Sequence, residues 1–288
     1  MKNILVPFDF SDHAESALQF AIEFNEVSHG RITLVYVIEY PLGNTFNITG
    51  EIGQLNNEDK ILTIELIKRM KAKLELFVNS DQYRGYHLNY QIMMGNPYDG
   101  IAKIVEETNI DLIIMGTQGA TGLKEMIVGS NAEKVVRNAK CPVITVHHGQ
   151  KFENIRNVVF ATELNTEHNV ALDLFKSNQE IFDAKIHLVW VFTPHSLIAE
   201  EIASEKLEQI ALKHGLKNYK THVERGYFPE EGILHYAKSN QADMIALATH
   251  SYKGLARLFL GSTTADLVNH SHMPIWSMSM KAIPQLVK

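Results

Sequence analysis

Residues 111–142 read DLIIMGTQGATGLKEMIVGSNAEKVVRNAKCP, and residues 243–274 read DMIALATHSYKGLARLFLGSTTADLVNHSHMP. The two stretches align without a gap at a constant offset of 132 residues, which places Gly129-Ser130 on Gly261-Ser262. Self-similarity over a segment of this length indicates two copies of one folding unit within the chain.

The beginnings of the two copies match as well. NILVPFDFSDHAESAL from Asn3 resembles NVVFATELNTEHNVAL from Asn157, at an offset of 154 residues. Because the offset then falls from 154 to 132, the second copy lacks 22 residues. A Gly- and Asn-rich stretch at residues 41–57, expected as a loop, is replaced there by little more than TPHS and accounts for part of the difference. We therefore expect domains at residues 1–147 and 154–280, joined by a linker, HHGQKFEN, at residues 147–154.

Apolar, β-rich runs alternate with helix-length segments in the first copy. Strands are expected at residues 4–8, 32–38, 88–93, 112–115 and 143–146, and helices at about residues 11–27, at residues 58–78, from Pro97 onward and after Ser130. Strands that are nearly continuous in Val, Ile and Leu and separated by helices indicate a parallel sheet covered on both faces. The predicted fold class is α/β, with two tandem doubly wound parallel five-stranded sheets.

The composition narrows the class of protein. The chain has 288 residues, 45% of them hydrophobic and 21% charged, which is typical of a globular protein rather than a disordered one. A net charge of -6 gives no basic surface for nucleic acid, and the apolar runs are too short to span a bilayer. The single cysteine, Cys141, cannot form an internal disulfide, and the opening MKNILVPFDFSD lacks the apolar core of a secretory signal. We expect a cytoplasmic protein.

In open parallel sheets, ligands bind beyond the carboxyl ends of the strands. Three segments should meet there: residues 7–9, residues 37–39 and the loop of residues 116–130. In that loop Gly116, two residues, Gly119 and nine residues precede Gly129-Ser130, which opens a helix. Backbone N–H groups at a helix N-terminus attract anions, so the loop predicts a phosphate site, although it lacks both the Gly-Lys-Ser/Thr of a Walker loop and G-x-G-x-x-G.

At these residues the sequence resembles the universal stress protein family. Gly116, Gly119, Gly129 and Ser130 match the family pattern G-x2-G-x9-G-[ST], and the opening ILVPFDFS at residues 4–11 and the Cys141-Pro142 strand start are equally typical. The resemblance covers nearly the whole chain as a tandem pair. It implies an adenine-nucleotide α-hydrolase-like fold, related to flavodoxin-like folds, and a small-molecule ligand, ATP or else ADP or AMP, with Mg²⁺ as an optional companion.

The resemblance also implies roles for single residues of the first copy. The phosphates would lie on Gly116, Gly119, Gly129, Ser130 and Asn131, the ribose on Asp9 with Pro7, and the base on Val37, with Met115 packed against the nucleotide. Asp9 has an alternative role as a helix cap, and the glycines an alternative role as simple turn residues.

The second copy departs from the pattern. It has Glu163 in place of Asp9, Ala248 in place of Gly116 and Ser251 in place of Gly119, while Gly261-Ser262 is kept. Ala248 matters only if the backbone at this position needs a positive φ. The Ser251 side chain would leave less room for a ligand near the loop backbone, and the longer Glu163 side chain would reach farther into the ribose position. We expect one competent site and one weakened or empty site.

No residue set in the sequence predicts strong catalysis or a metal centre. The histidines show no metal-ligand spacing, Cys141 is expected to be buried, and Lys124, the loop's lysine, contacts either phosphate or solvent. The leading hypothesis is a stress-response regulator that binds an adenine nucleotide and signals to an unidentified protein partner. The alternatives are a nucleotide-free pseudo-dimer whose last strands, residues 143–146 and 275–278, pair edge to edge, with or without further homodimerisation, and a weak ATPase or adenylate-transfer enzyme.

Overall fold

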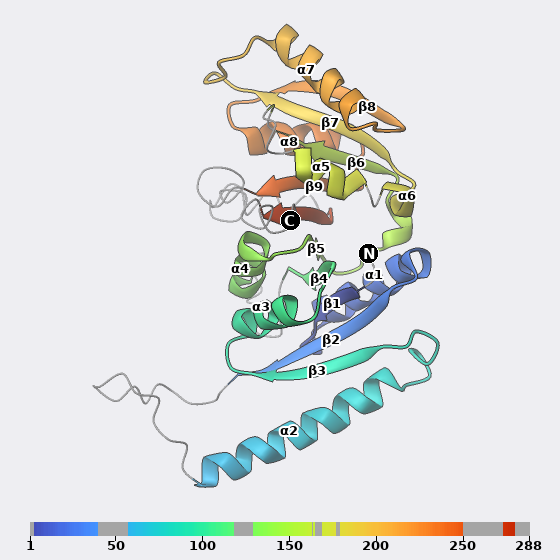
Figure 1. Ribbon diagram of the computed structural model, residues 1–288, viewed down its shortest axis with the longest axis vertical. Helices are drawn as coiled ribbons and strands as arrows, with labels where there is room; N and C mark the ends of the chain where they lie inside the picture. The colour runs from blue at the N-terminus through green and yellow to red at the C-terminus, as the bar shows by residue number, and fades with distance from the viewer. Residues whose placement is uncertain are drawn as a thin grey trace, which may run out of the picture.

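The computed structural model describes residues 3–39, 57–117, 129–162, 164, 169–176, 179–249 and 273–279. The first copy contains strands β1 (Asn3–Pro7), β2 (Arg31–Ile38), β3 (Asn89–Met94), β4 (Leu112–Gly116) and β5 (Val143–Val146), and helices α1 (Asp12–Ser28), α2 (Asn57–Val78), α3 (Pro97–Glu107) and α4 (Ser130–Asn138) (Figure 1). The five predicted strands and the predicted helices are present, with ends that differ by one residue or so. The expected loop lies outside the described residues, except for Asn57, which begins α2.

The second copy follows a short 3-10 helix, η1 (Phe152–Asn154), and repeats the alternation. Its strands are β6 (Asn157–Ala161), β7 (Lys185–Phe192), β8 (Tyr219–Arg225), β9 (Met244–Thr249) and β10 (Ile275–Ser279), and its described helices are α5 (Asn169–Lys176), α6 (Gln179–Phe182), α7 (Glu200–Lys213) and α8 (Pro229–Ser239). Residues 250–272, which hold the second copy's Gly261-Ser262, lie outside the described residues.

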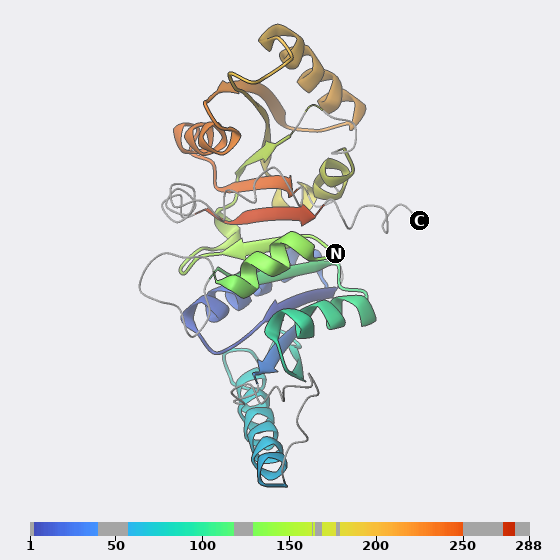
Figure 2. The same cartoon turned by 90° about the vertical axis from the view of Figure 1, so that its left-hand side faces the viewer.

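The strands of both copies form one sheet in the order β3-β2-β1-β4-β5-β10-β9-β6-β7-β8. Strands pair in parallel within each copy, whereas β5 and β10 pair antiparallel, with Ile144 opposite Trp276. The two predicted five-stranded sheets are thus joined through the predicted pairing of the last strands, since this pairing satisfies N–H and C=O groups that would otherwise be exposed at two edges. Figure 2 shows β5 and β10 side by side in the middle of the molecule.

Helices cover both faces of the sheet, as a doubly wound fold requires. Alternate residues of β1 point to opposite sides, so Ile4 and Val6 pack in the core that contains α1, whereas Leu5 packs in the core that contains α3 and α4. The first of these cores continues from one copy into the other. Figure 2 shows α3 and α4 together on one side of the sheet.

The predicted linker is part of this continuous core. Phe152 is buried, and its ring lies 5.8 Å from that of Phe20, 5.3 Å from that of Phe24 and 5.5 Å from that of Phe182, measured between centroids. Phe20 and Phe24 belong to α1, and Phe182 belongs to α6, so the linker holds helices of both copies together. The connection is a packed joint rather than a loose tether.

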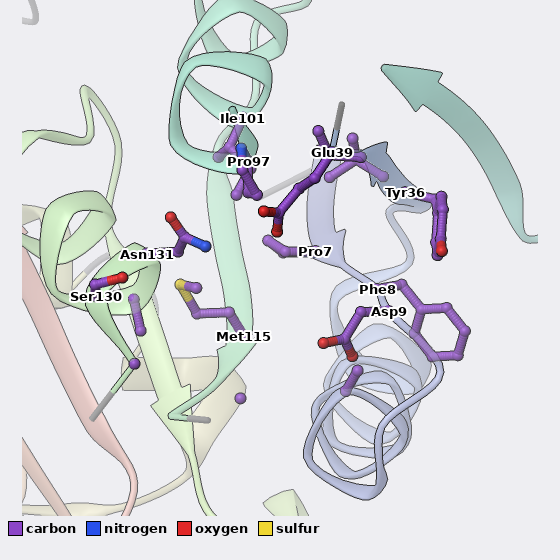
Figure 3. A pocket seen from close by; sticks show the side chains of 16 residues that line it. Pro7, Phe8, Asp9, Tyr36, Glu39, Pro97, Ile101, Met115, Ser130 and Asn131 are labelled. Carbon is purple, nitrogen blue, oxygen red and sulfur yellow. The ribbon is translucent and has the colours of Figure 1, made fainter. Parts of the chain in front are cut away.

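Each copy brings one helix close to its second strand through a glycine. A Cβ added at Gly100 of α3 would lie 3.3 Å from Val37 Cγ2, and one added at Gly232 of α8 would lie 2.6 Å from Val191 Cγ1. The pairs correspond through the offsets of 132 and 154 residues found in the sequence. In the first copy, Figure 3 shows Pro97, at the start of α3, close to Glu39, the residue that follows β2.

Candidate functional site

A cavity of about 360 Å³ opens where β1, β2 and β4 end and where α3 and α4 begin. Eight of the nine residues predicted to bind a ligand line it: Pro7, Asp9, Val37, Met115, Gly116, Gly129, Ser130 and Asn131 (Figure 3). The ninth, Gly119, lies outside the described residues. The strand order places β1 between β2 and β4, and this arrangement brings segments distant in sequence to one place.

Further lining residues escaped the sequence-based prediction. They are Phe8, Ala14, Val35, Tyr36, Glu39, Pro97, Ile101 and Ala132. Pro97 and Ile101 belong to α3, which connects β3 to β4 and so must cross over β2 and β1. Knowledge of the strand order in the sheet would have placed α3 beside the cavity, but the spacing of apolar residues along the sequence does not reveal that order. Phe8 and Glu39 lie in segments that were expected at this edge of the sheet, but neither was assigned a role in binding.

The start of α4 forms one end of the cavity. Gly129 is the N-cap of α4 and makes no side-chain cap hydrogen bond, so the helix begins without the usual Ser, Thr or Asp acceptor. The Gly129 N–H donates to the Thr117 carbonyl at 2.7 Å, and the Thr117 hydroxyl lies 3.1 Å from His147 Nδ1. The N–H of Gly129 is therefore already used within the protein, whereas the N–H groups that immediately follow it have no partner among the described residues. Ser130 and Asn131, the first two residues of α4, line the cavity.

Close packing against α1 requires a glycine at position 116. A Cβ at this position would lie 2.8 Å from His13 Cβ and 2.9 Å from the His13 backbone, while no positive φ is recorded for Gly116. The criterion used on the sequence, a positive φ, was therefore wrong for this residue: α1 leaves no room for a methyl group. In the second copy, Ala248 of β9 aligns with Gly116. The helix that corresponds to α1 is α5, and its described part starts at Asn169, which aligns with Glu15 and not with Asp12, the first residue of α1.

Asp9 lies in the turn between β1 and α1. The Ser11 N–H donates to Asp9 Oδ1 at 3.0 Å, and Ser11 itself is the N-cap, since its Oγ accepts from the Ala14 N–H at 3.2 Å. Phe10 between them adopts a left-handed φ of 63°, uncommon for a residue with a Cβ. The turn directs Asp9 to the cavity and Phe10 toward the rings of Phe8 and Phe77, at 5.0 and 5.6 Å between centroids.

The described lining of the cavity carries two carboxylates, Asp9 and Glu39, and contains no lysine, arginine or histidine. Burial raises the pKa of Tyr36, and the charges of Asp9 and Glu39 raise it further. Attraction for an anion therefore comes from the start of α4 and from neutral donors, whereas the opposite part of the cavity favours hydrogen-bond donors or cations.

Other candidates from the sequence have simpler environments. Cys141 is 4% exposed, and burial, followed by the charge of Asp111, raises its pKa to about 12, so it is a neutral core thiol as expected. Within the described ranges, no three His, Cys, Asp or Glu side chains are grouped to hold a metal ion. The same ranges contain no helix with the length and hydropathy needed to cross a membrane. Glu163, Ser251 and Gly261-Ser262 lie outside them.

The fold and the cavity define a tandem α/β protein with a ligand-sized site at the carboxyl ends of the strands of its first half. The model of the universal stress protein family matches residues 1–147 and again residues 154–277. The chain therefore belongs to the universal stress protein family, as its sequence motifs indicated.

Relatives match either one copy or the tandem pair. Universal stress protein MJ0577 of Methanocaldococcus jannaschii is 32% identical over 152 residues, which cover 50% of this chain and 94% of the relative. Universal stress protein Slr1230 of Synechocystis is 24% identical over 294 residues, covering 96% of this chain and 99% of the relative. The crystal structure of a universal stress protein from Archaeoglobus fulgidus shares the fold, with a TM-score of 0.70, 20% identity, and coverage of 96% of this chain and 98% of that one.

Proposed function

We propose that the first copy, residues 1–147, binds ATP or another adenine nucleotide as a regulatory ligand, and that the second copy, residues 154–280, carries the weakened site. The observation that supports this most directly is the cavity itself: one end is the uncapped start of α4, and the other is an apolar slot between β2 and α3. A phosphate chain suits the first end and a flat base suits the second.

The lining suggests a position for each part of the nucleotide. The base would lie between Val37 and the first turn of α3, where Pro97 and Ile101 are apolar. The ribose would lie beside Asp9, because a carboxylate accepts hydrogen bonds from a diol. The phosphates would lie at Ser130, and Mg²⁺ would accompany a triphosphate, because the described lining offers no cationic side chain.

Regulation fits the structure better than turnover. The described lining offers two carboxylates but no histidine, lysine or cysteine. The far end of α4 instead touches the joint between the copies: the Ser279 hydroxyl of β10 donates to the Arg137 carbonyl at 2.9 Å. We infer a cytoplasmic stress-response regulator in which occupancy at one end of α4 is communicated to the joint at the other.

Replacing the N-cap of α4 tests the proposal. Gly129→Asp would cap the helix and place a negative charge at the proposed phosphate position, so ATP affinity, measured by calorimetry, should fall at least about tenfold while the melting temperature is kept. Ala199→Asp is the matched control, because Ala199 is also an N-cap without a side-chain bond, at α7 in the second copy. Equal ATP affinity of the wild type and Gly129→Asp would contradict the proposed site.

The pairing of β5 with β10 favours a second candidate, a pseudo-dimeric scaffold that works without nucleotide. This candidate predicts purified protein that carries no nucleotide and binds none at millimolar ATP. A weak ATPase or adenylate transferase would instead release phosphate or pyrophosphate linearly with time in the presence of Mg²⁺, and Gly129→Asp would abolish that release.

A further inference from the structure

The mouth of the cavity is formed by alternate residues of β2 and the residue that follows it. Val35, Val37 and Glu39 all line the cavity, because residues two apart on an extended strand share a face. Their exposure increases along this row: Val35 is 1% exposed, Val37 is half-buried and Glu39 is exposed. A group that rests on Val37 therefore has Glu39 as its next neighbour toward solvent.

The slot around this row is otherwise apolar. Pro97 and Ile101 of α3 line the same cavity, and Gly100 allows α3 to approach Val37 closely. Figure 3 shows the Glu39 side chain turned back over the cavity, with its carboxylate near Pro7 and Pro97 rather than directed away from them. Glu39 is thus the charged group at the apolar end, and Asp9 is the charged group nearer α1.

The Glu39 carboxylate forms no hydrogen bond or ion pair with the described part of the chain, and no cationic side chain is among the described lining residues. A carboxylate at neutral pH only accepts hydrogen bonds, so it attracts an N–H donor and repels a carbonyl or phosphate oxygen. A ligand that places a phosphate at Ser130 has its opposite end, the base, in reach of this acceptor.

We propose that Glu39 selects the base, by accepting a hydrogen bond from the exocyclic amino group of an aminopurine and by repelling the carbonyl oxygen that an oxopurine carries at the same position. This inference rests on the proposed nucleotide site and adds a specificity-determining residue to it. Thr193 occupies the aligned position in the second copy, where its hydroxyl lies 3.3 Å from Ser196 Oγ, so that copy lacks the selecting charge.

ATP and ITP provide a direct test, since they differ only in the 6-amino and 6-oxo groups and in the adjacent N1, which carries a hydrogen in ITP but not in ATP. The wild type should bind ATP about tenfold more tightly than ITP in calorimetry at one fixed Mg²⁺ concentration, a ratio expected for one charge-assisted hydrogen bond at a partly exposed site. Glu39→Gln should weaken ATP binding, strengthen ITP binding and bring the ratio of the two affinities close to one, because an amide presents a donor as well as an acceptor.

A charge-matched control separates local recognition from net charge. Glu107→Gln removes the same charge from the last residue of α3, where the side chain is 60% exposed and outside the cavity, so it should keep the wild-type ratio. If the wild type binds both nucleotides equally, or if Glu39→Gln keeps the preference for ATP, base selection by Glu39 is wrong while the nucleotide site stands. If neither nucleotide binds, the proposed function falls and base selection falls with it.

Discussion

Gly116 shows how a single residue can be shaped by its neighbours before any ligand is considered. Its Cα lies so close to His13 that a methyl group would meet three atoms at 2.8 to 2.9 Å, two of them backbone atoms that cannot rotate away. The sequence identified Gly116 by its motif, but the contact joins residues more than a hundred positions apart, and its closeness depends on how α1 crosses β4. Local patterns carry no information about such a crossing.

Gly116→Ala should therefore destabilise the fold. Inserting a methyl group into a contact of this kind typically costs about 1–3 kcal/mol, which urea unfolding measures. Gly85→Ala is the matched control, since no atom lies within 4 Å of its added Cβ and no positive φ is recorded there. That variant should be neutral or slightly stabilising. Equal stability of the two variants would mean that α1 lies farther from β4 than described.

At the scale of elements, the corresponding helices α3 and α8 of the two copies begin with different N-caps. Asn96 caps α3, its Oδ1 accepting from the Tyr98 N–H at 2.9 Å, whereas Phe228 is the N-cap of α8 and makes no side-chain cap bond. Both helices have proline next, at Pro97 and Pro229, and the α3 start was predicted from that proline. Helix ends with such local signals are predictable from sequence, and those set by packing are not.

Substitutions at the N-caps of α3 and α8 should show how much an asparagine cap contributes to the free energy of unfolding. Asn96→Ala should lower the free energy of unfolding by about 1 kcal/mol, and Phe228→Asn should raise it by a similar amount. Phe228 is 49% exposed, so little buried surface is lost with its ring. Thermal and urea unfolding of both variants measure the two changes. Stabilisation by Asn96→Ala, or destabilisation by Phe228→Asn, would show that the cap does not control these helix starts.

At the scale of the whole molecule, the duplication was visible in the sequence, whereas the pairing of the last strands was expected only for the alternative of a nucleotide-free pseudo-dimer. A repeat with a constant offset is a global signal, and the last strand of each copy needs a partner at its exposed edge. The core that passes through Phe152 was not predicted, because the linker appeared as a polar segment with one aromatic residue. The two copies also differ at the site: the first keeps the cavity residues, and the second departs from them at Glu163, Ala248 and Ser251.

Native mass spectrometry with increasing ATP and Mg²⁺ shows whether only the first copy binds ATP, because it counts ligands on each intact chain. We expect one ATP per chain over a wide concentration range, and the Gly129→Asp variant should reach the same occupancy only at ATP concentrations at least about tenfold higher. Two equivalent ATP molecules per chain, or a single ATP that Gly129→Asp still binds as tightly as the wild type, would show that the start of α4 in the first copy is not the ATP site.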